Sequence, residues 1–568
     1  MGEWDREVDV LVFGSGIGAL TTALVGRCEG LSVLLCEKTS QPGDTAATSG
    51  GTVWIPGSSP AQQRGVGDFA AVRSYLDAEI GERPEDAPLR EAFLASGAEA
   101  LDYLAARSEV KFSFNNPIPY PDYHPENTGG ALRGRALSPL PFDTNVLGDD
   151  FALVRAPMPE FMILGGMMVA RPEIPHFVRT WSSWASLRLV TRAVLRYGCD
   201  RLRFSRGTRL HLGNALIARL LHSLRAAGAE IAVNAALVEL VRDNSRVAGA
   251  VVEINGKRLR IGARRGAMLA TGGFGASASH RAALMQRDDI GESLVFPANV
   301  GQGLDYAQAV GAALDRAHDS PAFWMPSSTH TRADGTKALY PHIRDRPKPG
   351  MIAVNAKGQR FVNEAASYHD FVLAMFAAQL SEAWLICDRA FIRDYGIGMI
   401  PAVWQNLRRY IRSGYLATGE TPEALAQRIG VDAEGLGRTV GEHNQFALTG
   451  VDLAFGKGSS ALNRHNGDAA VKPNPCLRPI GSGPFFAVRV EPTPIGTAIG
   501  LRTDADARVL DAAGAPITGL YATGSDMSSI MRGHYPGPGI TLGPSLIFAY
   551  RAARQMRLAA NAPVGVSM

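Results

Sequence analysis

The stretch Val8-Asp9-Val10-Leu11-Val12-Phe13-Gly14-Ser15-Gly16-Ile17-Gly18-Ala19 decides the fold of the N-terminal part of the chain. Its apolar half predicts a buried strand, and its glycines predict a tight turn before a helix from Leu20 to Val25. A second apolar strand is predicted from Ser32 to Cys36, and Glu37 follows it directly. Strand, glycine turn, helix, strand and acid in this order match the dinucleotide-binding fingerprint G-x-G-x-x-G/A, with Ala19 at the third glycine position.

The fingerprint has a physical basis. Glycines let the turn approach a pyrophosphate closely, the helix N-terminus stabilises its negative charge, and Glu37 can accept a hydrogen bond from a ribose hydroxyl. The sequence therefore predicts an α/β fold with a Rossmann-like nucleotide-binding domain. We assign the nucleotide contacts to Gly14, Ser15, Gly16, Gly18, Ala19, Glu37 and Lys38.

Three later segments indicate which dinucleotide binds. Residues 43–51 are a second loop of small residues, residues 265–273 predict a strand ending in Ala-Thr-Gly-Gly, and residues 519–524 predict the strand Gly-Leu-Tyr-Ala-Thr-Gly. With the fingerprint, they resemble flavoproteins of the fumarate reductase and succinate dehydrogenase superfamily, except that Asp44 stands where a second glycine is usual. The resemblance implies FAD as the cofactor. It adds these residues to the predicted contacts: Thr45, Ser49, Gly50, Gly51, Val238, Ala270, Thr271, Gly272, Gly524, Ser545 and Leu546.

The resemblance also predicts a discontinuous FAD-binding domain. We assign residues 1–275 and 487–568 to it, and residues 276–486 to an inserted catalytic or cap domain. A chain of 568 residues is too long for one compact core, so two or three domains are expected. Within the insertion, residues 350–364 are predicted to form two strands joined by an Asn-to-Gly turn, and residues 421–450 to be rich in helix.

Composition and charge exclude several classes of protein. A net charge of +4 is too small for a nucleic-acid-binding surface on a chain of this length. The five cysteines are scattered, odd in number and without a C-x-x-C pair, which predicts a reduced cytoplasmic protein with no structural metal. No apolar run approaches the ~20 residues of a membrane span, and the first strand begins too close to Met1 for a secretion signal.

The segment from Arg171 to Arg209, within the predicted FAD-binding domain, carries nine arginines against two acids. Arg188, Arg192 and Arg196 recur at every fourth position and share one face of a predicted helix, and tryptophans precede them. A basic amphipathic helix led by tryptophans is typical of a membrane-surface anchor. Two interpretations stay open. Residues 177–206 hold the protein on the inner face of the cell membrane, or the helix packs its apolar face against the core or another subunit.

The C-terminal loop Arg532-Gly533-His534-Tyr535-Pro536-Gly537-Pro538-Gly539-Ile540-Thr541-Leu542-Gly543 joins a phenol, two prolines and four glycines before a predicted helix. Proline fixes φ, and glycine lets another molecule approach the backbone closely. A tyrosine hydroxyl and a backbone N–H presented together can bind one oxygen of a substrate. We therefore expect the loop to hold a substrate against the flavin.

The same loop makes the resemblance more specific. Its Y-P-G-P-G-x-x-L-G pattern, the N-E-x-x-x-Y segment ending at Tyr368 and the P-D-Y segment ending at Tyr123 resemble the 3-ketosteroid Δ1-dehydrogenases, from Val8 to about Arg554. The resemblance implies 1,2-desaturation of a 3-ketosteroid. In that reaction Tyr535 and the N–H of Gly539 donate to the ketone, Tyr368 removes the α-proton with help from Tyr123, and a hydride passes from the β-carbon to flavin N5. An external electron acceptor then reoxidises the flavin.

Alternatives stay open at this point. Desaturation of another ring ketone, of the cyclohexanone type or at a Δ4-(5α) steroid position, fits the same tyrosines. A fumarate reductase-like flavoprotein is a more distant alternative, because dicarboxylates need converging cationic side chains and only Arg532 offers one here. A flavin-binding scaffold without turnover is disfavoured by the complete set of tyrosines.

Overall fold

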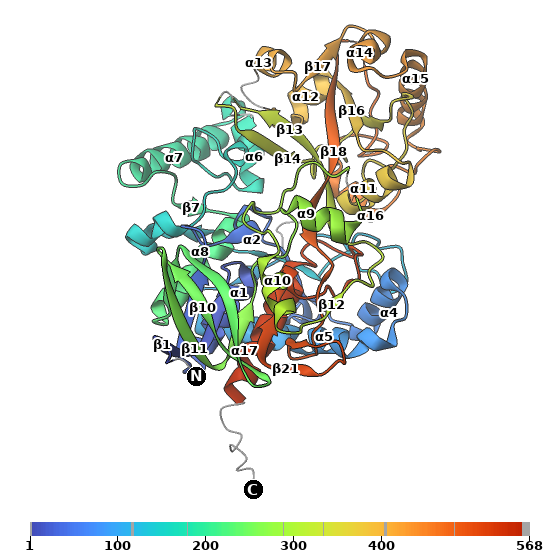
Figure 1. Ribbon diagram of the computed structural model, residues 1–568. Helices are drawn as coiled ribbons and strands as arrows, with labels where there is room; N and C mark the ends of the chain where they lie inside the picture. Colours follow the sequence, from blue (N-terminus) through green and yellow to red (C-terminus); the bar gives the residue numbers. More distant parts are fainter. Residues whose placement is uncertain are drawn as a thin grey trace.

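A computed structural model describes residues 3–558 apart from 115–118, 179, 288, 333, 403–405 and 482. Figure 1 shows a lower body, which holds both ends of the described chain, and an upper body built from the yellow and orange middle of the sequence. Each body is organised around its own sheet. The predicted mixture of helix and sheet is therefore confirmed.

The lower sheet contains the fingerprint. β1 (Arg6–Phe13) lies between β2 (Val33–Glu37) and β11 (Lys257–Leu269), parallel to both, and β21 (Pro516–Ala522) pairs with β11 in parallel. The other strands are β8 (Glu230–Val233) beside β2, β10 (Arg246–Ile254) beside β11, β9 (Ala235–Asp243) beside β10, and β20 (Arg508–Leu510) beside β21. Strands from both ends of the sequence therefore share one sheet.

Close packing explains why small residues are needed at the start of α1 (Ile17–Cys28). A Cβ on Gly14, whose φ is +103°, would lie 2.0 Å from the carbonyl oxygen of Ala270. A Cβ on Gly18 would lie 2.6 Å from the side chain of Thr523 and 2.7 Å from that of Ser545. The first ten residues of α1 are buried, and the helix packs directly against α17 (Leu542–Leu558).

The remaining helices of the lower body complete its layers. α5 (Ala87–Arg107) packs against α17, and α8 (Leu212–Ala226) packs against α1 and the short α2 (Asp44–Thr48). Smaller elements include β3 (Val53–Trp54), α4 (Phe69–Ile80), α10 (Gln302–Ala309) and β12 (Leu314–Asp315).

The upper sheet is antiparallel, with the order β14-β13-β18-β16-β15 and β17 also paired to β18. Its strands are β13 (Ala322–Thr331), β14 (Lys337–Pro341), β15 (Met351–Val354), β16 (Ala383–Asp388), β17 (Ala417–Gly419) and β18 (Phe485–Thr497). The proposed domain boundary at residue 487 thus falls inside a strand of this sheet. α11 (Tyr368–Ala377) packs against β13, and α14 (Pro422–Ile429) and α15 (Ala433–Thr449) are the predicted helices of residues 421–450.

The predicted strand pair at residues 350–364 forms only in part. β15 is the first strand, and a tight turn follows in which the N–H of Asn355 bonds the carbonyl of Gln359. The chain then makes a single bridge between Val354 and Arg360 and no further described strand within that range. The return segment is held instead by a buried ion-pair cluster, because Arg360 bonds both Glu364 and Asp452.

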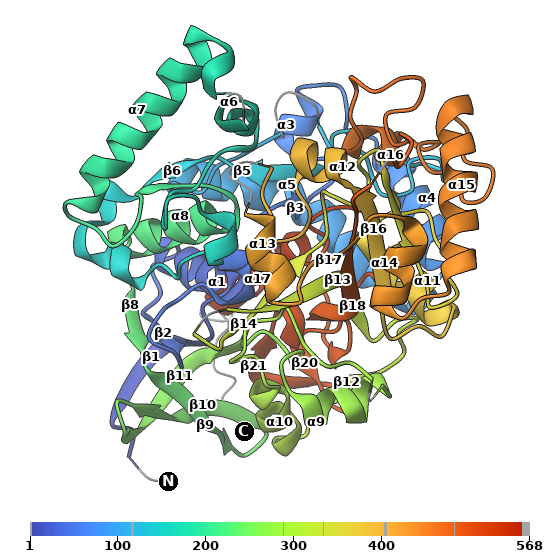
Figure 2. The ribbon, with the colours of Figure 1, turned by 90° about the horizontal axis from the view of Figure 1, so that it is seen from above.

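The basic segment forms the predicted helix, α7 (Trp184–Arg201), which Figure 2 shows at the edge of the molecule. Leu187 and Val190 are partly buried, whereas the side chains of Trp181 and Trp184 are 87% and 86% exposed. None of the helices in the described part of the chain combines the length and the apolar character that crossing a bilayer requires.

The glycines of the C-terminal loop let its backbone lie on β3. Added Cβ atoms would lie 2.6 Å from the indole nitrogen of Trp54 at Gly537, 2.4 Å from the Thr52 carbonyl oxygen at Gly539, and 2.3 Å from the Trp54 carbonyl oxygen at Gly543. At these three positions the space that a side chain would take is filled by Thr52 and Trp54 of the same chain.

Replacing Gly543 by alanine should destabilise the protein. The new methyl group would overlap the Trp54 carbonyl, and overpacking of this kind costs about 1–3 kcal/mol. The matched control is Gly441→Ala in α15, where nothing lies within 4 Å, so the alanine should be neutral or stabilising by up to about 1 kcal/mol. Thermal unfolding of both variants checks the prediction, and equal melting temperatures would contradict it.

Candidate active site

Three predicted tyrosines from distant segments meet between the two bodies. Tyr123 lies in a loop after α5, Tyr368 is the first residue of α11, and Tyr535 lies in the C-terminal loop. Their ring centroids are 5.6 Å apart for Tyr123 and Tyr368, 5.6 Å for Tyr123 and Tyr535, and 5.1 Å for Tyr368 and Tyr535. The structure therefore brings together the three side chains to which the sequence argument gave the chemistry.

The hydroxyl groups of this cluster interact with one another. That of Tyr368 interacts with those of Tyr123 and Tyr535, and the hydroxyl of Thr541 interacts with that of Tyr535. Burial raises the pKa of each of the three phenols well above its ordinary value of 10. Without a ligand, the cluster is thus a set of neutral donors and acceptors.

Backbone contacts fix Tyr535 beside Tyr123. The carbonyl of Pro536 accepts a hydrogen bond from the N–H of Tyr123 at 2.8 Å and another from the hydroxyl of the fully buried Tyr75, on α4, at 2.6 Å. Asp122 accepts from the indole of Trp54 at 3.0 Å and from Arg135 at 2.6 Å. The Tyr123 segment, β3 and the C-terminal loop are therefore one hydrogen-bonded unit.

Gly539 meets the requirements of a backbone donor. Its φ of +97° is unfavourable for a residue with a side chain, and its N–H makes no hydrogen bond to any residue in the described ranges. Its carbonyl, in contrast, accepts from the N–H groups of Trp54 and Gly543. The residue is held by its carbonyl, and its donor is left available.

The histidines beside the tyrosines differ in surroundings. His369 is buried, its Nδ1 accepts from the N–H of Trp324 at 3.2 Å, and its ring lies 5.8 Å from that of Tyr535. Burial lowers the pKa of His369 to about 4, so it is neutral at physiological pH. His534 points outward to Asp319 at 2.7 Å. His369 therefore packs beside the cluster, whereas His534 is directed away from it.

Arg532 already has partners. Its guanidinium bonds both oxygens of Asp86 and one oxygen of Asp315 on β12. It also adopts a φ of +52°, which these ion pairs hold in place. The arginine therefore anchors the start of the C-terminal loop, and its charge is neutralised inside the protein.

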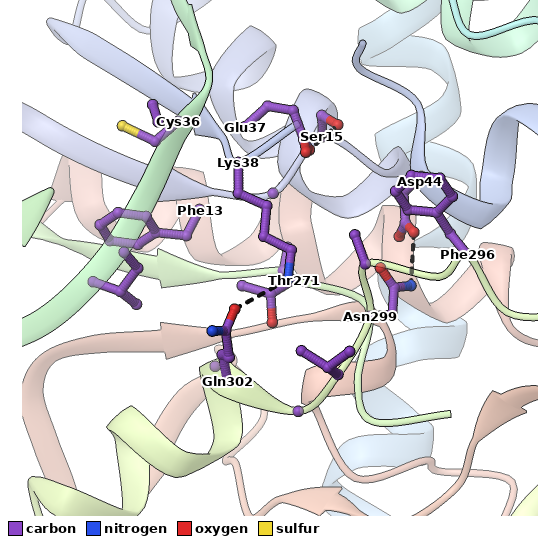
Figure 3. A pocket seen from close by; sticks show the side chains of 18 of the residues that line it. Phe13, Ser15, Cys36, Glu37, Lys38, Asp44, Thr271, Phe296, Asn299 and Gln302 are labelled. Carbon is purple, nitrogen blue, oxygen red and sulfur yellow. Dashed lines mark hydrogen bonds between the residues drawn. The ribbon is translucent and has the colours of Figure 1, made fainter. Parts of the chain in front are cut away.

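A separate cleft of about 550 Å³ opens at the fingerprint (Figure 3). Six predicted cofactor residues line it: Gly14, Ser15, Glu37, Lys38, Ala270 and Thr271. Among the residues that the sequence argument missed are Asp44, Leu237, Asn299 and Gln302. Lys38 bonds Gln302 at 3.0 Å, and the oxygens of Glu37 bind the hydroxyls of Ser15 and Thr39.

The other predicted cofactor residues are distributed around the cleft. Gly16 and Gly272 face Asp44, and Ser49 and Gly51 pack on the start of α8. The hydroxyl of Thr45 accepts from the N–H of Phe296. Gly18, Gly524 and Ser545 pack together, and Ala19 and Leu546 are fully buried. Gly50 is exposed. Val238 does not line the cleft, because its neighbours Ala235 and Leu237 on β9 do so and side chains alternate along a strand.

The cleft fits a dinucleotide. Gly14 and Ser15 of the glycine turn line the cleft just before the N-terminus of α1, the Asp44 carboxylate lies beside Gly16, and the Glu37 carboxylate stands at the end of β2. Asp526, another residue not found from the sequence, holds the opposite wall by accepting from the N–H groups of Thr271 and Gly273 at 2.5 and 2.9 Å.

Comparisons with known proteins agree with this geometry. The family described as "FAD binding domain" matches residues 9–542. The 4-oxocyclohex-2-ene-1-carboxylate 5-dehydrogenase of Sinomonas cyclohexanicum is 37% identical, over 98% of this chain and 94% of the relative. The 3-oxosteroid 1-dehydrogenase of Mycolicibacterium smegmatis is 34% identical, over 98% of each. The crystal structure of 3-ketosteroid Δ1-dehydrogenase from Sterolibacterium denitrificans, solved with 1,4-androstadiene-3,17-dione, superposes with a TM-score of 0.88 at 35% identity, covering 98% of this chain and all of the other.

The fold, the cleft and these relatives define a flavoprotein oxidoreductase whose cofactor is FAD. Within that class, the chain belongs to the FAD-binding family, and 3-oxosteroid 1-dehydrogenases are among its relatives at 33–34% identity over nearly the whole chain.

Asp44 should weaken FAD binding in a pH-dependent way. Its carboxylate lies beside Gly16, burial raises its pKa to about 6, and Asn299 donates to it at 2.7 Å. Above pH 6 it adds a negative charge near the pyrophosphate, and below pH 6 it is neutral. We expect Asp44→Asn, which keeps the Asn299 bond, to bind FAD about 3- to 10-fold more tightly at pH 7.5 and to lose most of this gain at pH 5.

Fluorescence titration of the deflavinated protein with FAD measures this change. Asp305→Asn is the control, because it removes a half-exposed carboxylate from α10, close to the cleft but outside it. An affinity gain of Asp44→Asn that is equal at both pH values would contradict the assignment.

Proposed function

We propose that the chain catalyses FAD-dependent dehydrogenation of a ring ketone, and that its substrate is a 3-ketosteroid desaturated between C1 and C2. The observation that carries the proposal is the cluster of Tyr123, Tyr368 and Tyr535 at the loop that presents the free N–H of Gly539. Formation of an enolate requires donors to the ketone oxygen and a base for the α-proton, and the site offers two donors, Tyr535 and Gly539, beside two further phenols.

In the proposed reaction, the hydroxyl of Tyr535 and the N–H of Gly539 donate to the ketone oxygen. The α-proton becomes acidic only if the developing enolate oxygen is stabilised, and preorganised donors in a buried site do this. Tyr368 first loses its own proton to solvent, helped by its contact with Tyr123, and the phenolate then takes the α-proton and becomes a neutral phenol again. Bound FAD supplies the acceptor, at flavin N5, for the hydride that leaves the β-carbon, and an external acceptor removes the electrons.

The charges around the tyrosines support a neutral substrate. Arg532 is paired with Asp86 and Asp315, and the buried Arg346 donates to the backbone carbonyls of His342 and Glu364. Neither is available to bind the carboxylates of a fumarate-like substrate. The fumarate reductase-like alternative is therefore less well supported than a ketone.

A monocyclic keto acid is the second candidate. The relative that is 37% identical bears the name of a 4-oxocyclohex-2-ene-1-carboxylate 5-dehydrogenase. The same tyrosines serve either ring, so the two candidates share one mechanism. They differ in the size of the ring system that the pocket must hold and in whether it must also hold a carboxylate.

The discriminating experiment adds 4-androstene-3,17-dione or 4-oxocyclohex-2-ene-1-carboxylate to the anaerobic holoprotein and follows bleaching of the flavin absorbance. A flavin that neither compound bleaches would contradict the proposed function.

Tyr535→Phe should lower the rate of flavin reduction by about 10²–10³, as is found when one oxyanion donor is removed. The ring stays and only the hydroxyl is lost, so FAD content and folding should be unchanged. Tyr340→Phe is the control, since this phenol lies on β14, outside the cluster. Stopped-flow measurement of flavin reduction gives the rates, and a Tyr535→Phe rate equal to that of the wild type would remove the oxyanion role.

We also propose that residues 177–206 bind a membrane surface, with the protein otherwise in the cytoplasm. The exposed Trp181 and Trp184 favour this interpretation over core packing, because large apolar side chains are rarely left so exposed. Arg188 and Arg192 are exposed on the same helix, and Arg196 is paired with Asp143. Indoles and arginines together are suited to the interface of anionic lipids.

Liposome flotation tests membrane binding. The wild type should float with vesicles that contain anionic lipid at low salt and less at high salt, since arginine attraction is screened. A variant with Trp181→Ala and Trp184→Ala should lose flotation without losing flavin reduction, because neither side chain approaches the tyrosines. Absence of flotation at low salt, or insensitivity to salt, would favour the core-packing interpretation.

A further inference from the structure

His124 joins the segments that carry two of the tyrosines. It follows Tyr123 directly, and its two ring nitrogens contact two carboxylates. Nδ1 lies 2.7 Å from Glu79 on α4, in the lower body, and Nε2 lies 2.9 Å from Asp370 on α11, in the upper body (Figure 1). Asp370 stands two residues after Tyr368.

Each end of this link is fixed in turn. The second oxygen of Glu79 accepts from the side-chain amide of Asn127 at 2.6 Å, and the Glu79 side chain is only 4% exposed. Asp370 also accepts from the hydroxyl of Ser367 at 2.7 Å, and that hydroxyl caps the helix by accepting from the N–H of Asp370. The N–H of His124 bonds the Tyr75 hydroxyl, which itself bonds Pro536. The link therefore reaches the C-terminal loop as well.

We propose that His124, as an imidazolium held between Glu79 and Asp370, is a positioning residue that keeps the hydroxyl of Tyr123 in contact with that of Tyr368. This role rests on the proposed function, because it matters only if these two phenols handle the proton. The bodies that carry them have separate sheets, so a contact between single hydroxyl groups needs an independent tie nearby. The Glu79–His124–Asp370 series is such a tie, one residue from Tyr123 and two residues from Tyr368.

Charge gives the tie its strength. Burial alone would lower the pKa of His124, but hydrogen bonds to Asp370 and Glu79 raise it to about 10. The imidazolium therefore persists at neutral pH and donates to both carboxylates at once. Charge-assisted hydrogen bonds of this kind are about twice as strong as neutral ones.

The experiment compares four variants of the holoprotein. His124→Gln is neutral and short and cannot donate strongly to both carboxylates, whereas His124→Arg keeps the charge and has enough donors for both. Asp370→Asn removes the tie from the other end. His534→Gln is the control. His534 is also next to a cluster tyrosine, Tyr535, has a similar exposure and contacts a carboxylate. That carboxylate, Asp319, lies on a segment without a cluster tyrosine.

The first readout is single-turnover flavin reduction by the ketone that bleaches the wild type. A small misplacement of reacting groups costs about 10²-fold, so His124→Gln and Asp370→Asn should each slow the limiting rate by about 10- to 100-fold. The ketone concentration at half saturation should change by less than about 2-fold, since the donors at Tyr535 and Gly539 are intact. His124→Arg should recover most of the rate, and His534→Gln should match the wild type. A His124→Gln rate equal to that of the wild type, or no recovery by His124→Arg, overturns the proposal.

The second readout needs no substrate. Hydrogen exchange should quicken in His124→Gln at the amides of Tyr123 and His124 and at those of Asp370 and Phe371, which are bonded on either side of the tie. Exchange unchanged at these amides overturns the proposal whatever the enzyme acts on. A third outcome separates the two proposals: exchange becomes faster in His124→Gln, but no ring ketone reduces the flavin of the wild type. The tie would then exist, the proposed function would have failed, and the positioning role would fail with it.

Discussion

The site depends on one packing constraint: the backbone of the C-terminal loop must lie against β3 with no side chain between them. Three glycines make this possible, and any Cβ at those positions would overlap the strand. Once the loop is seated, the Pro536 carbonyl receives the Tyr123 N–H, and the Gly539 carbonyl receives that of Trp54. The two expected ketone donors, Tyr535 and Gly539, are therefore preorganised by backbone contacts, which need no reorganisation when a substrate arrives.

Burial that fixes the tyrosines also sets their chemistry. A buried phenol keeps its proton, so Tyr535 is well suited to donate, while the same environment opposes the ionisation that a base needs. The two tasks are compatible only if the base is helped by groups that the donor lacks. The interaction with Tyr535 lowers the pKa of Tyr368 against the effect of burial, whereas that with Tyr123 raises it. The positive charge of Arg346 lowers the pKa of Tyr123. In the proposed reaction, donor and base therefore differ in their partners and not in residue type.

Much of this arrangement could be predicted from the sequence, because local patterns encode it. The fingerprint, α1, α7, α17 and the three tyrosines all follow from short motifs with their spacing. What escaped prediction depends on pairing between distant segments: Asp526 with Thr271, Asn299 with Asp44, and His124 with Asp370. The loop glycines were recognised as special, but no local pattern shows that Thr52 and Trp54 pack against them at Gly537, Gly539 and Gly543. The exposure of Trp181 and Trp184 could not be predicted either, because the spacing of apolar residues indicates a helix face but not whether other residues cover it.

The internal pairing of arginines bears on the two substrate classes that the relatives represent. A carboxylate brought near the tyrosines would add a negative charge where burial already disfavours phenolate, and would make proton removal by Tyr368 harder. A cation free to neutralise it would have to come from the same region. Arg532 is committed to Asp86 and Asp315, and Arg346 to backbone carbonyls, while Phe323 packs edge-on against Tyr535 with ring centroids 5.5 Å apart. An apolar ring system next to its ketone satisfies such a site without any added charge, and this favours a steroid over a keto acid.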